Sequence, residues 1–594
     1  MQKINELGKV YKSDLLVIGG SIAGLATAIK AKQLKPDMDI LVVEKGYAGF
    51  SGQSTRAGHG IALNDAGGTP TLTTAEYLVG SHTPYMSDQE LLLKYIPRKT
   101  ESAQFLLDCG VSVGKNPDGT LWNAQMPHRL WGMGGIDITV NESLRKHALK
   151  LDIRILSRVN IFELLTAKED GRAIGGIGFD MAHGECNIFR AKAVCLCTHG
   201  AHFKKAAGCA GMFMAYGTGL GAAYRAGAMM RNAEFSTQSD NIQVKDGLPS
   251  YGAYNLLHNG KGDNISAKYQ PGGGKIDGVS AELAIGMRTE VENGNPPIWA
   301  DLEHPDMLYK IVSAREPEAN ARVLPNKFEW EELVDEKTAK YRGALGLQPE
   351  MTLHFAIQVE ALHVDHKFRT CVPGLFASGK MTAAGCSYFG WTHGDGVGNA
   401  AVTSLFAGES IAEYFSEDPG MPDLQYDQVR RHKEKIYAPL HRDTAHSHYE
   451  IWNRIEELSH DIYIALNKSE KVIHAVLNEI EELKKIVPLL SADDPHSLAK
   501  CLEAADSLLA FEMVFRAADM RKESRGIQYP HYRSDYPAQD DKNWLKWINI
   551  KQGTSGEMEL FTEDIPMWRY PFRPEGYEIP EGHAEEYYVD RARC

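Results

Sequence analysis

A chain of 594 residues is too long for a single hydrophobic core, so about two to four domains are expected. A hydrophobic share of 43% and a charged share of 24% are typical of a folded globular protein, and the net charge of −14 argues against a nucleic-acid-binding surface. The nine cysteines are scattered and none have C-x-x-C spacing, which argues against an iron–sulfur cluster or zinc ribbon held by this chain.

No apolar run reaches the roughly 18–20 residues needed to cross a bilayer. The amino-terminal residues also lack the apolar core of a secretory signal. We therefore expect no direct membrane insertion and a cytoplasmic location, where cysteines stay reduced.

The first predicted element is an apolar strand that enters a glycine turn and an alanine-rich helix, over residues 15–34. A second apolar strand ends in Glu44, twenty residues after Gly24. In a dinucleotide-binding unit the glycines let the backbone approach a pyrophosphate, the helix amino terminus faces its charge, and the acid binds a ribose hydroxyl. The turn reads Gly19-x-Ser21-x-x-Gly24, and serine is small enough to leave room for a phosphate. Although glycine turns also occur for structural reasons, the flanking elements predict nucleotide binding.

The following segments alternate between predicted sheet and helix. A Gly-, Ser- and Thr-rich loop exposes its backbone for hydrogen bonds, and a polar, glycine-rich, irregular stretch is typical either of a functional lid or of a surface insertion. In chain order we expect the loop at 47–64, helices and loops at 67–140, short strands at 154–180 with a turn at 169–171, a buried strand at 191–201, the irregular stretch at 228–355, sheet and helix at 356–413, a charged helical bundle at 425–525, and an aromatic- and proline-rich end.

Seven segments, in the same order, resemble the flavoprotein subunits of the fumarate reductase and succinate dehydrogenase family, most nearly the alpha subunit of adenylylsulfate reductase within it. They are VIGGSIAGLATA with VVEKG, SGQSTRAGHGIALN, CLCTHGA, YGTGLGAAYRAGA, VPGLFASG, HGDGVGNAAVTSLFAGESIA and ESRGIQYPHYRSDYPAQDDKNWLKW. The resemblance spans nearly the whole chain.

The resemblance implies an α/β fold, α+β overall. A bipartite Rossmann-like FAD-binding domain would be interrupted by an inserted capping domain and followed by a C-terminal helical domain. The expected boundaries are 1–227 and 356–424 for the two parts of the FAD-binding domain, 228–355 for the capping (substrate) domain, 425–527 for the helical bundle, and 528–594 for the aromatic-rich tail.

The resemblance also implies FAD rather than NAD. Gly52 stands where many family members carry a histidine that bonds covalently to FAD, so non-covalent FAD is expected. Lys380 stands where the family often has an acid, and whether it pairs with a phosphate, pairs with an internal acid or lies outside stays open. The helix after Gly398 would aim its positive end at the flavin. The implied cofactor-binding residues are Gly19, Gly20, Ser21, Gly24, Glu44, Lys45, Ser51, Gly52, Gln53, Val159, Thr198, Gly200, Gly379, Lys380 and Asn399.

Four residues are candidates for substrate chemistry. His354 lies near the family's active-site histidine and His393 just before a flavin-facing turn, where an imidazole could relay a proton, although a lone histidine is more often structural. Residues 282–283 stand where the family's catalytic arginine is expected, so Arg288 is either its substitute or a surface charge, and a fumarate or succinate substrate is in doubt. Tyr254 stands where the adenylylsulfate pattern has a tryptophan. No metal-ligand spacing occurs, so no metal is expected.

The leading hypothesis is an FAD-dependent oxidoreductase. A small organic substrate would bind between the FAD-binding and capping domains and exchange a hydride with flavin N5, so that an activated double bond is reduced or formed. One alternative is an adenylylsulfate reductase-type alpha subunit that acts on a sulfur substrate through flavin N5, and another is a non-catalytic FAD-binding scaffold. The resemblance implies a ferredoxin-like iron–sulfur subunit as electron carrier, and the oligomeric state stays open.

Overall fold

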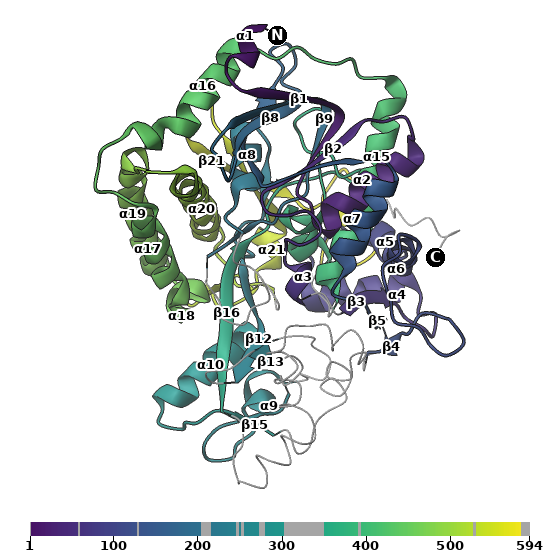
Figure 1. The fold of residues 1–594 in the computed structure, drawn as a ribbon. Coiled ribbons are helices and arrows are strands. Elements are labelled where there is room, and N and C mark those ends of the chain that lie inside the picture. Colours follow the sequence, from purple (N-terminus) through teal and green to yellow (C-terminus); the bar gives the residue numbers. More distant parts are fainter. Residues whose placement is uncertain are drawn as a thin grey trace.

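The computed structural model describes residues 2–57, 60–126, 130–203, 215–244, 249–250, 255–271, 279–301, 350–389, 394–526 and 530–583. A main body is built around one twisted sheet, a smaller lobe projects from it, and a group of long helices stands beside it (Figure 1). The candidate site lies in the main body.

The main sheet has seven strands in the order β6-β2-β1-β9-β8-β7, with β17 paired to β9. β1 pairs in parallel with β2 and β9, and β17 pairs in parallel with β9, so the carboxyl ends of these strands share one edge. Leu15 and Val17 of β1 join one buried apolar cluster and Leu16 and Ile18 the other, as expected for strands covered on both faces. The strands are β1 (Lys9–Ile18), β2 (Ile40–Glu44), β6 (Arg154–Ser157), β7 (Val159–Thr166), β8 (Ala173–Asp180), β9 (Cys186–Leu196) and β17 (Leu375–Ala377).

Helices α2 (Ile22–Leu34), α7 (Val140–Lys150) and α15 (Asp395–Tyr414) pack on the face that Leu15 and Val17 share. α2 and α15 lie in close contact, since a Cβ on Gly408 would stand 2.7 Å from the Lys30 Cβ atom. β17 and α15 follow the projecting lobe in the chain, yet β17 joins the main sheet and α15 packs on its face. The predicted fold class, a bipartite Rossmann-like domain with an insertion and C-terminal helices, is confirmed.

The segment between β2 and β6 contains more strand than predicted. Alongside the expected helices it forms a small antiparallel sheet in the order β3-β5-β4, in which Ile61 and Gly134 are register partners. Its elements are α3 (Ser54–Ala57), β3 (Gly60–Asn64), α4 (Thr71–Tyr77), the π-helix η1 (Leu78–His82), α5 (Gln89–Tyr95), α6 (Arg98–Asp108), β4 (Ala124–Gln125) and β5 (Trp131–Gly135).

The described part of the insertion is more regular than its composition indicates. Two long antiparallel strands, β12 (Thr237–Val244) and β16 (Met351–Val359), connect the main body to the projecting lobe (Figure 1). With β10 (Ala201–His202) and β13 (Pro249–Ser250) they form a four-stranded sheet. The described part of the lobe contains β14 (Leu257–His258), α9 (Ile265–Tyr269), α10 (Ala281–Glu292) and β15 (Trp299–Ala300).

The predicted helical bundle forms beside the main sheet, with α20 packed against α17 and α19. A final sheet in the order β11-β20-β21 joins the carboxyl-terminal region to β11, so this region lies over other parts of the chain as expected. The remaining elements are α1 (Gln2–Asn5), α8 (Thr218–Arg225), β11 (Met230–Arg231), α16 (Tyr426–Tyr437), α17 (His448–His460), α18 (Ile462–Ala465), β18 (Asn467–Lys468), α19 (Glu470–Ile486), α20 (Pro495–Met520), β19 (Tyr532–Arg533), α21 (Asp541–Trp544), β20 (Lys546–Gln552) and β21 (Met558–Asp564).

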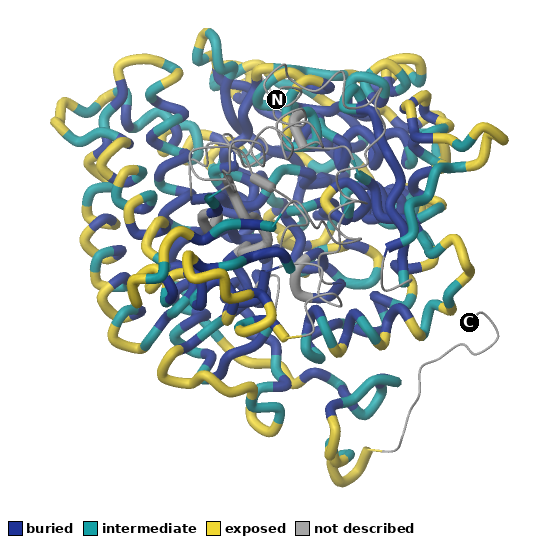
Figure 2. The backbone as a smooth tube through the Cα atoms, turned by 90° about the horizontal axis from the view of Figure 1, so that it is seen from below, coloured by how far each residue is buried: buried dark blue, intermediate teal, exposed yellow. Residues whose placement is uncertain are grey.

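Burial follows this arrangement, with buried backbone in the interior and exposed segments at the rim (Figure 2). α20 has a largely buried surface, because most residues between Leu498 and Ala518 along it are buried. Within the described residues, no helix combines the length and apolar character that a membrane span requires.

Candidate functional site

The glycine turn and the acid that follows it meet as their spacing predicts. The Gly20 amide donates to the Glu44 Oε2 atom at 2.6 Å, and the Gly46 amide donates to Glu44 Oε1 at 2.9 Å. At Gly24, which faces the turn, a Cβ would lie 1.8 Å from the Gly19 carbonyl oxygen. Gly19 itself has a φ of +116°, a conformation that other residues rarely adopt. β1 therefore runs into α2 through a turn that admits only glycine at two positions.

The Ser51-Gly52-Gln53 segment lies directly against this turn. The Ser21 and Ser54 hydroxyls are 3.0 Å apart, and a Cβ on Gly52 would stand 2.6 Å from the Ser21 Oγ atom. The Ser51 hydroxyl accepts a hydrogen bond of 2.8 Å from the Tyr47 amide, which closes the loop after β2. Two segments that the sequence assigned to the same cofactor are thus adjacent.

The carboxyl ends of β1, β9 and β17 bring two further predicted turns to the same edge. The Cys197 amide donates to the Ile18 carbonyl at 2.8 Å, and the Ser378 amide donates to the Leu196 carbonyl at 3.0 Å. Thr198 and Gly379 follow at once, so both stand beside the glycine turn. Gly200 also sits in a tight place, where a Cβ would lie 1.9 Å from the Val359 carbonyl oxygen. Crevices outside the carboxyl ends of parallel strands are where open α/β sheets bind ligands.

Asn399 supplies an observation that points to a ligand. It lies in the second turn of α15, only 2% exposed, and neither atom of its side-chain amide has a hydrogen-bond partner among the described residues. The Thr403 hydroxyl donates to the Asn399 carbonyl at 2.6 Å and accepts from the Gly379 amide at 2.8 Å, which fixes Asn399 beside the β17 turn. Because a buried amide without partners is costly, it fits a bound molecule with several polar groups, such as FAD.

Lys380 and Gln53 join three of the predicted segments. The Gln53 Oε1 atom lies 3.2 Å from the His199 Nε2 atom and 3.5 Å from the Lys380 ammonium nitrogen. Lys380 also lies 3.4 Å from the Glu360 Oε1 atom. Sequence reasoning missed Glu360, although an acid inside the apolar run Val359–Leu362 is a readable signal.

Lys45 and Val159 are placed differently from the other cofactor candidates. The Lys45 ammonium forms an ion pair with Glu503 of α20 and lies 4.4 Å from the centre of the Tyr216 ring. Burial lowers the pKa of Lys45. Its charge thus joins the main sheet to the helical bundle, a partner that the sequence did not indicate. Val159 is buried at the start of β7, and the preceding amide of Arg158 donates to the Gly46 carbonyl at 2.7 Å.

The four catalytic candidates differ in where the structure places them and in how much of each it describes. Arg288 lies on α10 with its side chain 54% exposed, and its Nε atom donates to Glu292 at 2.7 Å, one turn along the helix. That placement favours the surface-charge alternative. His354 lies in β16 as the register partner of Asn241 in β12, and only its backbone is described. His393 and Tyr254 lie outside the described residues.

His363 is a partly buried histidine. Desolvation and the nearby Arg231 guanidinium lower its pKa to about 3. Since the folded state binds its proton less tightly than the unfolded chain, this contribution to stability is present above about pH 6.5 and is lost as pH falls. Lowering the pH from about 8 to about 5 should therefore reduce the free energy of unfolding by about 2 kcal/mol. Urea unfolding of wild type and His363→Gln at both pH values measures it. A variant whose stability falls with pH as steeply as that of wild type would contradict the assignment.

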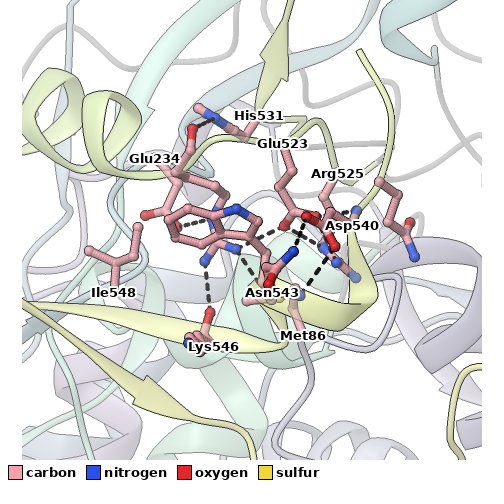
Figure 3. Close-up of polar contacts among 12 residues, drawn as sticks. Met86, Glu234, Glu523, Arg525, His531, Asp540, Asn543, Lys546 and Ile548 are labelled. Atoms are coloured by element: carbon pink, nitrogen blue, oxygen red, sulfur yellow. Dashed lines mark hydrogen bonds and ion pairs between the residues drawn. The ribbon is translucent and has the colours of Figure 1, made fainter. Parts of the chain in front are cut away.

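Sequence reasoning did not find a network of charged groups around Arg521, whose contacts are drawn in Figure 3. Arg521 is fully buried, and its guanidinium binds Glu234 at 2.7 Å and Glu523 at 2.9 Å. Glu523 also accepts from Arg525 at 2.7 Å, and His531 donates to the Arg521 carbonyl at 3.3 Å. Glu234 comes shortly before β12. The network therefore connects the start of the insertion to residues 523–526, near the carboxyl terminus.

One cluster among the described residues has side chains close enough to share a metal ion, namely Glu470, His474 and Asp519. The Lys522 ammonium already pairs with Glu470 at 3.5 Å and with Asp519 at 3.4 Å. An ammonium in that position competes with a metal cation, and the cluster is read as a surface ion-pair network.

Two family models match the chain. The model described as FAD binding domain matches residues 14–238, and the model described as fumarate reductase flavoprotein C-term matches residues 460–577. Among curated proteins, the 8-methylmenaquinol:fumarate reductase flavoprotein subunit of Wolinella succinogenes is 22% identical, over 97% of this chain and 94% of its own length. The L-aspartate oxidase of Yersinia pestis is 23% identical, over 89% of this chain and 96% of its own length.

Solved structures share the fold over nearly the whole chain. A quinol fumarate reductase of E. coli has a TM-score of 0.76 at 18% identity, covering 94% of this chain and 97% of its own. The adenylylsulfate reductase of Archaeoglobus fulgidus has a TM-score of 0.71 at 19% identity, covering 94% and 96%. At these identities the likeness concerns the fold, and the chemistry has to be argued from the residues.

Proposed function

We propose that this chain, which belongs to the fumarate reductase and succinate dehydrogenase flavoprotein family and is an FAD-dependent oxidoreductase, transfers a hydride or electrons between flavin N5 and a small organic substrate. The reaction is reduction of an activated double bond or its reverse. The observation that carries the proposal is the convergence of the glycine turn, the Gly52 segment, the strand ends at Thr198 and Gly379, and the buried amide of Asn399.

FAD is held without a covalent bond, since Gly52 offers no side chain to attach it. The turn from Gly19 to Gly24 faces the pyrophosphate, where backbone amides and the amino terminus of α2 favour negative charge. Glu44 accepts hydrogen bonds from the Gly20 and Gly46 amides, and in the complex it binds the ribose of the adenosine part of FAD. Asn399 and the Gly379 turn approach the flavin half, and the flavin supplies hydride-transfer chemistry.

The substrate binds between the FAD-binding domain and the insertion at 228–355, a type of interface that commonly forms small-molecule sites. His354 in β16 is the leading candidate for moving the proton that accompanies the hydride. His393 and Tyr254 are further candidates from sequence. Arg288 is the weakest, because its guanidinium is exposed and paired with Glu292.

A ferredoxin-like iron–sulfur subunit is the electron carrier that fits best. The relative from Wolinella succinogenes is named as a flavoprotein subunit, and the cysteines of this chain lack cluster spacing. Iron that copurifies with the natural complex would support this partner, whereas a complex free of iron would favour free flavin, a nicotinamide or a quinone as the donor.

A second candidate is the adenylylsulfate reductase-type reaction, in which a sulfur nucleophile meets flavin N5. The exposed position of Arg288 favours it, because the described part of the insertion then offers no arginine in the place expected for carboxylate chemistry. A scaffold that binds FAD without catalysis is the third option.

Anaerobic photoreduction of the full-length holoprotein separates these candidates. The leading proposal expects α,β-unsaturated acids to restore the flavin absorbance. If the chain carries out the sulfur reaction, sulfite should bleach the oxidised flavin, and unsaturated acids should leave the reduced flavin unchanged. If it is a scaffold, the flavin should respond to neither reagent.

A variant tests His354 in the same assay. His354→Gln should slow reoxidation by about a hundredfold or more without loss of bound FAD, because a positioned acid contributes about 10²–10⁴ in rate. His183→Gln, an exposed turn residue, is the control and should keep the wild-type rate. A wild-type rate in His354→Gln would remove His354 from the mechanism.

A further inference from the structure

Lys380 occupies a position that the flavin site leaves unexplained. It follows Gly379 in the short helix η3 (Gly379–Met381), directly after β17, and its side chain is only 11% exposed. Its ammonium nitrogen lies 3.4 Å from Glu360 Oε1 and 3.5 Å from Gln53 Oε1. The cation therefore stands where three segments of the proposed FAD site meet.

Two described titratable groups near Lys380, Glu360 and His199, offset its charge only in part. The Glu360 side chain is 1% exposed, and burial raises its pKa to about 7 even though Lys380 lowers it. His199, on the other side of Gln53, has a pKa well below its usual value because of burial and the Lys380 charge, so it is neutral. At neutral pH the cluster thus carries part of a positive charge in a buried place.

A buried positive charge beside a flavin has a definite electrostatic consequence. Reduction by two electrons, or addition of an anionic nucleophile to N5, places negative charge on the ring system, and in a medium of low dielectric a nearby cation stabilises it.

We propose that the Lys380 ammonium, oriented by Glu360 and Gln53, stabilises negative charge on the bound flavin and so raises both its reduction potential and its affinity for sulfite. This inference rests on the flavin site proposed above. Lys380 acts as a positioning charge: it takes no proton from substrate and forms no bond. When sulfite binds, its sulfur lone pair forms a bond to N5 and the electron pair passes into the ring system, where Lys380 meets the charge.

The test uses the full-length holoprotein and four variants. Lys380→Met removes the charge at similar length, Lys380→Arg keeps it, and Glu360→Gln removes the counter-charge. Lys192→Met is the control, since Lys192 is a similarly shielded lysine on β9 that pairs with Asp14 and Asp418. FAD content, midpoint potential against a reference dye, and sulfite affinity from loss of flavin absorbance are measured at about pH 7, where Glu360 is only partly ionised in wild type.

Lys380→Met should lower the equilibrium constant for two-electron reduction at least about tenfold, equivalent to about 30 mV, and weaken sulfite binding by a similar factor. Lys380→Arg and Lys192→Met should stay near wild type, and Glu360→Gln should shift both quantities the opposite way. If Lys380→Met loses its FAD, Glu360→Gln alone decides the matter by the direction of its shift.

Two results would overturn the inference while leaving the proposed function standing. One is a flavin-loaded Lys380→Met with unchanged potential and sulfite affinity, and the other is an equal loss in Lys380→Arg, which would indicate packing rather than charge. A wild-type protein that binds no FAD would instead refute the proposed function.

Discussion

Replacing Arg521 with methionine is expected to lower the unfolding free energy by about 3–5 kcal/mol. Arg521, Glu234 and Glu523 have fully buried side chains, so the guanidinium cannot be replaced by water. Glu523 would keep Arg525 at 2.7 Å, whereas Glu234 would lose the partner of its Oε1 atom. Burial already raises the pKa of Glu234, and removal of Arg521 raises it further. The loss of unfolding free energy thus comes from the Glu234 carboxylate, which stays buried without its cationic partner.

The source of that cost can be isolated with a second substitution. Arg521→Met combined with Glu234→Gln should recover part of the loss, because the double variant no longer buries an unpaired carboxylate. Urea unfolding followed by circular dichroism measures all variants. Arg454→Met is the matched control: Arg454 also pairs with two glutamates, but it is 41% exposed, so a change of at most about 1 kcal/mol is expected. Equal losses for both arginines would contradict the role given to burial.

Gly24→Ala is expected to abolish FAD retention. The added Cβ would stand 1.8 Å from the Gly19 carbonyl oxygen and 3.3 Å from the Val17 Cγ1 atom, so α2 has to move away from the turn. Backbone atoms cannot move aside as a flexible side chain does. The loss of unfolding free energy should therefore be larger than for ordinary overpacking, which costs about 1–3 kcal/mol. Because the turn and the helix amino terminus together face the pyrophosphate, a displaced α2 weakens FAD binding as well as the fold.

Gly80→Ala provides the matched comparison. Gly80 is an exposed glycine of η1 with open space around its Cα atom, so the same chemical change meets no neighbour there. FAD affinity by fluorescence quenching and FAD content after gel filtration should be unchanged in Gly80→Ala and lost in Gly24→Ala. Full retention of FAD by Gly24→Ala would mean that the turn is not where the pyrophosphate binds.

The sequence predicted the parts of the site that local geometry determines. The spacing of Gly24 and Glu44 identifies a strand–helix–strand unit. In the structure, Glu44 accepts a hydrogen bond from the Gly20 amide. The place of Arg288 could also have been read, because Glu292 one turn later forms the i,i+4 pair of an exposed helix face. Such features depend on residues near one another in the chain.

Features set by distant pairing could not be predicted in the same way. Lys45 pairs with Glu503, 458 residues away in the chain, and Arg521 pairs with Glu234, 287 residues away. Nothing in the local pattern around a lysine or an arginine says whether its partner is water or a buried acid. The insertion illustrates the same point: its polar composition indicates an irregular segment, yet β12 and β16 pair along it because each supplies the other's hydrogen bonds.

The flavin content of the purified full-length protein tests the central claim most directly. We expect about one FAD per chain, released intact into the supernatant when acid precipitates the protein, because the cofactor is bound without a covalent bond. A colourless protein that takes up no FAD on incubation would contradict it.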